Sequence, residues 1–247
     1  GKKSVGADGI ENTYDDGLPV TETEYKALLQ RIKSRGITAY TWAGQYPNYM
    51  NAFVFNLDYL YDNGARARAY KTTRGTVRNS EEKDIEINAS NGYLAADSQG
   101  ALKALELTAE LVNQKNGYYS GNAFKTTQTQ IKAQNEFLLS VKTNKRIAMI
   151  LEGSWWENEA LAMFEEMSEG RGNEKYAYKT RRFGVMLSPR LNASIVEDTS
   201  TKTILTSNST AFIPIYSSKQ DLAKKFLKYF CTDKACLLYT SPSPRDT

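Results

Sequence analysis

The chain has 247 residues, of which 40% are hydrophobic and 24% are charged, and its formal net charge is +4. These values are typical of a soluble globular protein, and the weak, dispersed positive charge argues against a nucleic-acid partner. The sequence contains no histidine. This absence excludes Ser-His-Asp and Cys-His catalytic sites and leaves few ways to build a zinc site. We therefore expect neither a metal nor a cofactor.

From the two ends of the sequence we expect a reading frame that was cut on both sides. The opening stretch GKKSVGADG has no apolar signal-peptide core, and no apolar run reaches the roughly 18 residues that span a bilayer. We expect either a cytoplasmic protein or a chain without its original beginning. Residues 236–247, CLLYTSPSPRDT, resemble a translated sequencing adapter and are expected to be non-native. Cys231 is then the single native cysteine, which excludes an internal disulfide.

The first third of the chain predicts a helix, a strand and a second helix. Residues 21–36 have helical periodicity, with Thr21 or Thr23 as the N-cap and Gly36 as the stop. Residues 37–44 are β-branched and aromatic, which favours a strand, and 46–64 form an aromatic-rich helix that ends at Asn63-Gly64. Residues 65–96 are polar and predicted to be irregular, with a solvated basic loop around Arg66, Arg68, Lys71, Arg74 and Arg78.

Helices and strands continue to alternate over the rest of the chain. We expect helices at 97–117 (with Asp97 as the N-cap), 129–145, 155–170 and 218–235 (with Ser217 or Ser218 as the N-cap), strands at 146–152, 181–190 and 209–217, and a loop at 191–203. This alternation, without a regular repeat, predicts an α/β protein with a largely parallel or mixed sheet. The spacing is too uneven for a (β/α)₈ barrel.

Five segments, taken in order, resemble one protein family. They are DGLPVTETEYKALLQRIKSRGI, TWAGQYPNYMNAF, FLLSVKTNKRIAMILEGSWWENE, FGVMLSPR and STAFIPIYSSKQDLAKKFLKYFCTDKA. Together they are similar to the carbohydrate-binding family of extracellular solute-binding proteins of bacterial ABC importers. Asn144-Lys145-Arg146 departs from the pattern, because the family more often has a glycine turn there.

The resemblance implies a type II periplasmic-binding-protein-like fold of which this chain holds a part. Residues 1–202 would form most of the second lobe, and residues 203–235 a crossing strand and helix that return to the first lobe. It also implies a carbohydrate ligand, permease subunits as partners, a monomer, and an extracytoplasmic place as a lipoprotein or periplasmic protein. We expect the lone lobe to bind sugar weakly.

The stretch EGSWWENE carries the strongest functional signal. Binding a sugar takes an aromatic platform for its apolar face and planar polar groups at its rim. Ligands of open α/β sheets bind beyond the carboxyl ends of strands, where Trp155 and Trp156 follow the predicted strand. Successive helical residues point about 100° apart, so only one ring is expected to face a cleft. The resemblance makes that ring Trp155, while Trp156 would pack with Phe164 and its neighbours; both rings could also be packing alone.

A second group of candidate ligand-binding residues follows the predicted strand at 37–44. The resemblance puts a sugar-stacking aromatic in the turn after it, where Tyr46 is the better candidate and Tyr49 the next. These tyrosines could instead staple the helix start. Trp42 could line the cleft or lie beneath it, and the second is favoured. Glu152 is a candidate partner for sugar hydroxyls, as are Gln45, Asn48 and Asn158, although all of them could serve as caps or be solvated.

These observations favour a ligand-binding protein over an enzyme, with two alternatives. A carbohydrate-active enzyme, such as a glycosidase or lyase, would need two acids about 5–10 Å apart in a cleft, one with a raised pKa. Glu165-Glu166 does not fit, because neighbouring helical residues diverge. A surface interaction module would instead need a large exposed apolar patch away from Trp155.

Overall fold

The computed structural model describes residues 5–6, 9–13, 16–153, 155–192 and 211–232. The chain divides into two compact units, Gly1–Leu205 and Thr206–Thr247. The predicted boundary between residues 202 and 203, most of the predicted loop at 191–203 and the adapter-like segment 236–247 lie outside the described residues.

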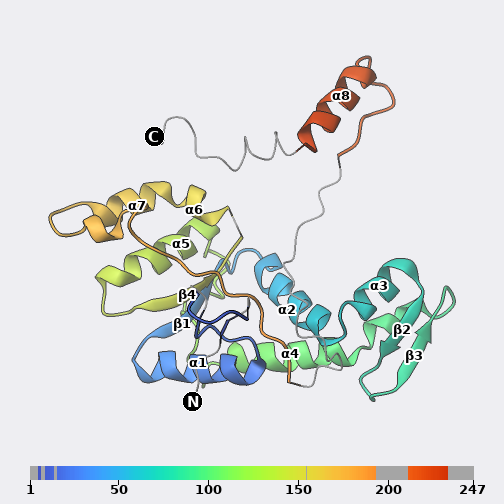
Figure 1. The fold of residues 1–247 in the computed structure, drawn as a ribbon, viewed down its shortest axis with the longest axis horizontal. Helices are drawn as coiled ribbons and strands as arrows, with labels where there is room; N and C mark the ends of the chain where they lie inside the picture. The colour runs from blue at the N-terminus through green and yellow to red at the C-terminus, as the bar shows by residue number, and fades with distance from the viewer. Residues whose placement is uncertain (1–4, 7–8, 14–15, 154, 193–210, 233–247) are drawn as a thin grey trace. The chain divides into compact units, whose positions relative to one another are not determined.

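The first unit combines helices and short strands (Figure 1). Its elements in chain order are α1 (Glu22–Ser34), β1 (Thr38–Trp42), α2 (Asn48–Tyr61), α3 (Ala65–Thr72), β2 (Gly75–Arg78), β3 (Asp84–Ile87), η1 (Gly92–Ala96), α4 (Gln99–Leu111), α5 (Gln130–Leu139), η2 (Ser140–Lys142), β4 (Ile147–Leu151), α6 (Trp156–Glu159), α7 (Leu161–Ser168) and η3 (Glu174–Tyr176). The second unit contains α8 (Gln220–Phe230). This is a mixed α/β architecture, which confirms the predicted class at that level.

A small parallel sheet lies at the centre of the first unit. β1 and β4 pair in parallel from Thr38↔Ile147 to Trp42↔Leu151. On the other side of β1, the Tyr40 N–H donates to Tyr118 O (2.9 Å) and the Ser120 N–H donates to Tyr40 O (2.8 Å). Residues 118–120 therefore run parallel to β1 as well, and three neighbouring segments end at the same edge of the sheet.

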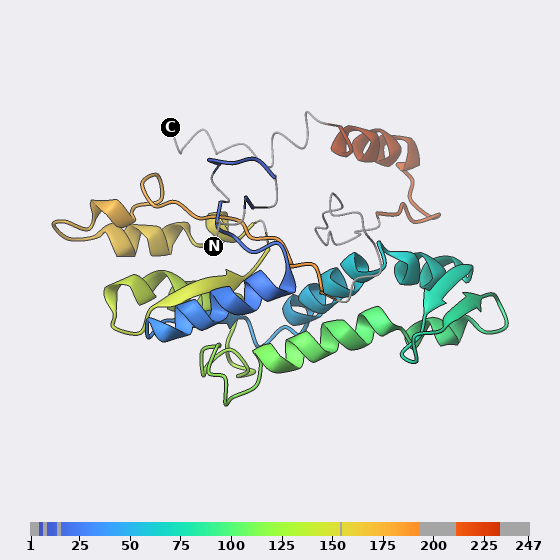
Figure 2. The ribbon, with the colours of Figure 1, turned by 60° about the horizontal axis from the view of Figure 1, so that its bottom comes forward.

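Helices cover both faces of this sheet, as Figures 1 and 2 show. α1 packs on β1 from one face, and α5 packs on β1 and β4 from the other. One cluster of buried hydrophobic side chains joins α1, α2 and α4 to the sheet through Tyr25, Leu29, Phe53, Leu57 and Leu107. A second hydrophobic cluster joins α5 and α7 through Phe137, Leu138, Phe164 and Met167. Burial of these apolar side chains on both faces is the main stabilising contribution to the sheet.

Local signals explain why the first three predicted elements are confirmed. Thr21, rather than Thr23, caps α1: its hydroxyl accepts from the Glu24 N–H, and the Glu24 carboxylate accepts from the Thr21 N–H. This reciprocal capping box stabilises the first helical turn. Gly36, at φ +69°, ends the helix in a left-handed conformation that glycine adopts without strain.

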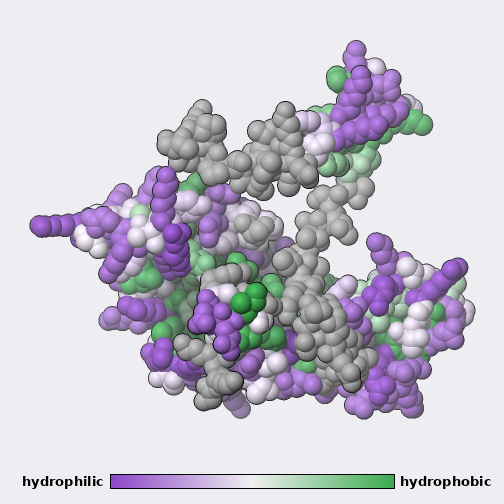
Figure 3. Space-filling view, viewed as in Figure 1, coloured by the Kyte–Doolittle hydropathy of each residue, from purple (hydrophilic) through white to green (hydrophobic). Residues whose placement is uncertain are grey.

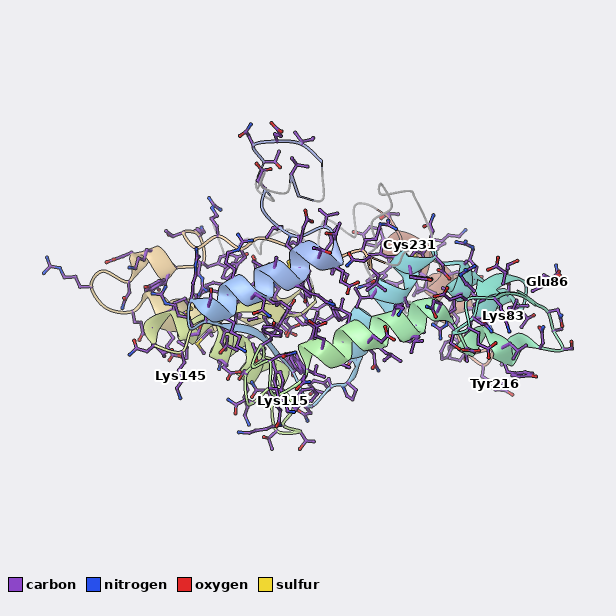
Figure 4. All side chains as sticks on the ribbon, turned by 90° about the horizontal axis from the view of Figure 1, so that it is seen from below. Lys83, Glu86, Lys115, Lys145, Tyr216 and Cys231 are labelled. Carbon is purple, nitrogen blue, oxygen red and sulfur yellow. The ribbon has the colours of Figure 1, made fainter. Side chains whose placement is uncertain are left out.

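The prediction of an irregular segment at 65–96 is wrong. α3, the antiparallel hairpin of β2 and β3, and η1 occupy it, with Lys83 and Glu86 on the hairpin (Figure 4). The Arg66 guanidinium pairs with the buried carboxylate of Asp58 at 2.5 Å and donates to Ala95 O at 3.0 Å. Asp62 accepts from the N–H groups that begin α3. Arg66, Arg68 and Lys71 therefore belong to α3, which packs on α2, η1 and β2, while Arg78 ends β2 and Arg74 lies between the two elements.

Several predicted boundaries are also wrong. Ser98 caps α4 instead of Asp97, and Lys219 precedes α8 without the predicted serine cap. The predicted helix at 155–170 is broken at Ala160 into α6 and α7. Within the described residues, the predicted strand at 181–190 forms one isolated bridge, from Arg190 to Thr21, and no ladder. Residues 211–217, the described part of the last predicted strand, do not form one either.

Glu136 of α5 ties the third parallel segment to the sheet. One carboxylate oxygen accepts from Ser120 Oγ (2.5 Å) and Asn122 Nδ2 (2.9 Å). The other accepts from Thr41 Oγ1 (2.8 Å) and Gln128 Nε2 (2.9 Å). Four neutral donors thus converge on one half-buried carboxylate, which joins α5, β1 and the loop 120–128.

We predict that Glu136→Gln lowers the free energy of unfolding by about 2–3 kcal/mol. The amide nitrogen of glutamine is a donor and would face two of the donors that a carboxylate oxygen now accepts, so those hydrogen bonds would be lost. Urea denaturation measures the change. Glu165→Gln removes a carboxylate from the exposed side of α7 and should stay within about 0.5 kcal/mol of the parent. Equal stability of the two variants would contradict the role given to Glu136.

Candidate functional site

The carboxyl ends of β1 and β4 adjoin, because Trp42 pairs with Leu151 in the parallel register. Tyr46 and Tyr49 follow β1, and Glu152 and Trp155 follow β4. Parallel pairing therefore brings two groups of predicted residues, far apart in the sequence, to one edge of the sheet. This is the edge where ligands bind in open α/β sheets.

Trp155 presents its ring to solvent from the start of α6. The residue is 51% exposed, and its indole rests against Gly153. A Cβ added at Gly153 would lie 2.3 Å from Trp155 Cη2, which no real side chain allows. Glycine thus allows the close approach of the ring, which a side chain at this position would displace. The geometry gives a half-exposed aromatic surface braced against the backbone.

Trp156 has different surroundings from its neighbour. Its ring makes edge contacts with Phe183 (centroids 4.9 Å apart) and Phe137 (6.0 Å) and a tilted contact with Phe164 (6.2 Å). It packs against the cluster that contains Ala160 and Met163. The two tryptophans are therefore divided between solvent and core, as the helical step predicts. Which of them binds a ligand stays a prediction.

The two tyrosines lie at the start of α2. Tyr46 is 38% exposed, Tyr49 is half-buried, and their ring centroids are 6.4 Å apart. The Tyr49 side chain is hydrogen-bonded to Glu152, which connects α2 to the end of β4. Burial raises the pKa of the Tyr49 hydroxyl, and the Glu152 charge adds to the rise. Tyr49 is therefore a neutral donor at physiological pH.

Glu152 is the centre of a hydrogen-bond network that the sequence only partly predicted. Its Oε2 accepts from the Gly153 N–H (2.8 Å), and its Oε1 accepts from Gln134 Nε2 (3.1 Å). The same Gln134 nitrogen donates to Glu159 Oε2 (2.9 Å), so these two carboxylate oxygens lie within about 6 Å of each other. Burial raises the pKa of Glu152 and the Glu159 charge adds to it, although the hydrogen bonds from Gly153, Gln134 and Tyr49 oppose the rise.

Sequence reasoning missed Gln134 and Glu159. A signal for Gln134 was present: it is a polar residue on the apolar side of a helix, next to Ala133 and followed by Phe137. Its side chain is 1% exposed. A buried glutamine needs partners, and these come from β4 and α6. For Glu159 the sequence offers no comparable signal, because an acidic residue near a helix start is common.

Trp42 lies beneath this edge, as the favoured alternative predicted. It is 4% exposed, and its ring packs against Tyr119 (5.7 Å) and the edge of Phe124 (4.9 Å). Phe124, which sequence reasoning did not single out, is 53% exposed. Its loop passes so close to Gly44 that a Cβ there would lie 2.2 Å from Ala123 O. Trp42 therefore supports the edge rather than presenting a surface.

A cavity of about 450 Å³ lies elsewhere, at the amino ends of the strands. Thr38, Ile147, Glu136 and Asn135 line it, together with the exposed Lys145, whose position Figure 4 marks. None of the predicted ligand-binding residues lines it. The cavity is thus separate from the predicted site, and the Glu136 carboxylate in it already accepts hydrogen bonds from four side chains.

Two searches of the described part of the chain and two comparisons add no further assignment. Within the described ranges, no group of three or more His, Cys, Asp or Glu side chains could hold a metal ion. In the same residues, none of the helices has the length and apolar character to cross a bilayer. No family model and no curated protein matches the sequence.

The division between the tryptophans predicts unequal effects on stability. Trp156→Ala should lower the free energy of unfolding by about 3 kcal/mol, since it removes a ring packed among three phenylalanines. Trp155→Ala should cost about 1 kcal/mol or less, because half of its surface is already in water. Urea denaturation followed by circular dichroism measures both, and equal losses would contradict this placement.

The raised pKa of Glu152 predicts a pH-dependent difference between the parent chain and Glu152→Gln. The folded parent holds the Glu152 proton more tightly than the unfolded chain, so this residue's contribution to stability falls as the pH rises above the ordinary carboxyl range. Glutamine does not titrate. The stability of the variant relative to the parent should therefore improve between about pH 4 and pH 7. Paired urea titrations test this, and a constant difference would show that Glu152 is not perturbed.

Proposed function

We propose that this chain is the carbohydrate-recognising component of a bacterial ABC importer and that the sugar binds at the carboxyl ends of β1 and β4. The observation that carries the proposal is the half-exposed indole of Trp155 braced on Gly153. A pyranose ring has an apolar face that suits such a surface. The exposed Tyr46 and the polar groups of Tyr49 and Glu152 would supply contacts at the rim of the sugar.

The resemblance of five ordered segments to extracellular solute-binding proteins supports the same proposal. In that reading, the described first unit belongs to the second lobe of a type II periplasmic-binding-protein-like fold, and α8 belongs to the return into the first lobe. The carboxyl edge of β1 and β4 would then be one wall of a two-lobed cleft. Closure of the lobes around the sugar would then present the loaded protein to the permease outside the cytoplasmic membrane.

The proposal predicts that Trp155 and Trp156 differ in ligand binding. A thermal-shift screen of mono- and oligosaccharides would identify the sugar, and calorimetry would measure its affinity. Trp155→Ala and Gly153→Ala should each weaken binding by about tenfold or more, because one removes the ring and the other displaces it. Trp156→Phe, which keeps an aromatic ring in the core, should bind like the parent.

The result that would contradict this assignment is the reverse pattern, in which Trp156→Phe loses binding and Trp155→Ala keeps it. The sugar recovered after incubation should also be intact, because a binding protein does not change its ligand. Chromatography of the recovered sugar provides that measurement.

A second candidate, glycoside hydrolysis, is favoured by one observation. Glu152 and Glu159 lie close enough for the retaining mechanism, in which the two acids are about 5–5.5 Å apart, and burial raises the pKa of Glu152 as a general acid requires. Against it, both Glu152 oxygens already accept hydrogen bonds from Gln134 and Gly153, and Tyr49 donates to the same carboxylate. Cleavage of the recovered sugar that Glu152→Gln abolishes would favour this candidate.

A further inference from the structure

Glu152, Glu159 and Gln134 form a polar centre with too few donors. From this arrangement we infer that the centre binds an ammonium group of the ligand and that the sugar is an amino sugar. The inference rests on the proposed function and specifies its ligand. It uses residues that the family resemblance does not assign, because Gln134 and Glu159 emerge only from the folded geometry.

The balance of donors and acceptors is the first step. The donors that reach Glu152 are the Gly153 N–H, the Gln134 amide and the Tyr49 hydroxyl, all of them neutral. Glu159 accepts from the same Gln134 nitrogen. Among the ion pairs of the described residues, none includes Glu152 or Glu159. Two carboxylates within about 6 Å therefore share the Gln134 nitrogen, and neither pairs with a lysine or arginine of the described residues.

The orphan oxygen of Gln134 is the second, independent observation. Gln134 is 1% exposed, and its Oε1 is buried without a hydrogen-bond partner. Rotating the amide by 180° would not help, because the oxygen would then face the two carboxylates that the nitrogen now serves. An unpaired buried acceptor is destabilising. The amide that joins the two glutamates thus has an acceptor that still lacks a donor, and neither glutamate is paired with a basic side chain of the described residues.

A primary ammonium matches this deficit. It carries one positive charge and three N–H donors, and it has no acceptor that would need a donor from the protein. Calcium takes six to eight oxygen ligands, waters included, and is the alternative that the test below separates from an ammonium group. Glu159 lies on the exposed side of α6, so its side chain can move to admit the group. Acidic sugars would be repelled by the same two carboxylates.

The position of Trp155 connects the ammonium to a sugar ring. The Glu152 carboxylate accepts from the N–H of Gly153, and the Trp155 indole rests against the same glycine. A ligand that places its ring on the indole would therefore have its substituents near the carboxylates. The electron-rich face of the indole also attracts a cation. A neutral ring with an adjacent amine satisfies both surfaces.

Three disaccharides with the same β-1,4 linkage and different 2-substituents test the inference: fully deacetylated chitobiose, N,N′-diacetylchitobiose and cellobiose. Each sugar would be titrated into the whole chain up to millimolar concentration, with tryptophan fluorescence and calorimetry as readouts. A pH near 6.5 would keep the amine charged. The amino disaccharide should bind about tenfold or more tightly than the other two. Glu159→Gln should remove most of that preference, and the matched charge change Glu165→Gln should leave it intact.

The other outcomes separate the two proposals. Equal affinity for the three disaccharides would overturn ammonium recognition while leaving carbohydrate binding in place. Failure of all three, together with a negative saccharide screen, would overturn both. A further titration with the amino disaccharide compares calcium chloride with sodium chloride at equal ionic strength. Selective displacement of the amino disaccharide by calcium would assign the centre to an inorganic cation and overturn the inference.

Discussion

The parallel pairing of β1 with β4 is the constraint on which the rest of the structure depends. It joins two strands from distant parts of the sequence and aligns their carboxyl ends, Trp42 beside Leu151. A parallel pair cannot be closed by a hairpin, so its connection passes through helices that pack on the sheet. α5 performs this role and also carries Glu136 and Gln134, which bind the loop 120–128 and the end of β4. Loss of the pairing would separate the two halves of the candidate site.

Gly153 carries two requirements within one residue. Its N–H donates to the Glu152 carboxylate, and the absence of a side chain lets the Trp155 ring rest against it. The first contact partly offsets the penalty of burying a carboxylate, and the second holds a large ring half exposed to water. Neither arrangement is the most stable choice. A side chain smaller than tryptophan would expose less apolar surface, and a neutral side chain in place of Glu152 would avoid the burial of a charge. Such unfavourable features concentrated in one turn are typical of binding sites.

The apolar side of α8 is a feature that the sequence pattern predicts without its packing partner. Considered alone, the helix has Leu222, Phe226 and Phe230 exposed, with lysines on its other side, and Figure 3 shows both kinds of surface on it. The amphipathic pattern was visible in the sequence, and the helix forms where it was predicted. What covers its apolar side is a property of tertiary structure that periodicity does not carry.

The sequence by itself determined local features: the presence and order of α1, β1 and α2, and the separation of Trp155 from Trp156, because each depends on neighbouring residues and on helical or strand geometry. It failed at residues 65–96, where the Arg66–Asp58 pair and the packing of a hairpin decide the structure. Only the tertiary structure brought Gln134 and Glu159 to Glu152. These three residues come from α5, α6 and the end of β4, and which carboxylates share one amide depends on how those elements pack, not on their spacing in the chain.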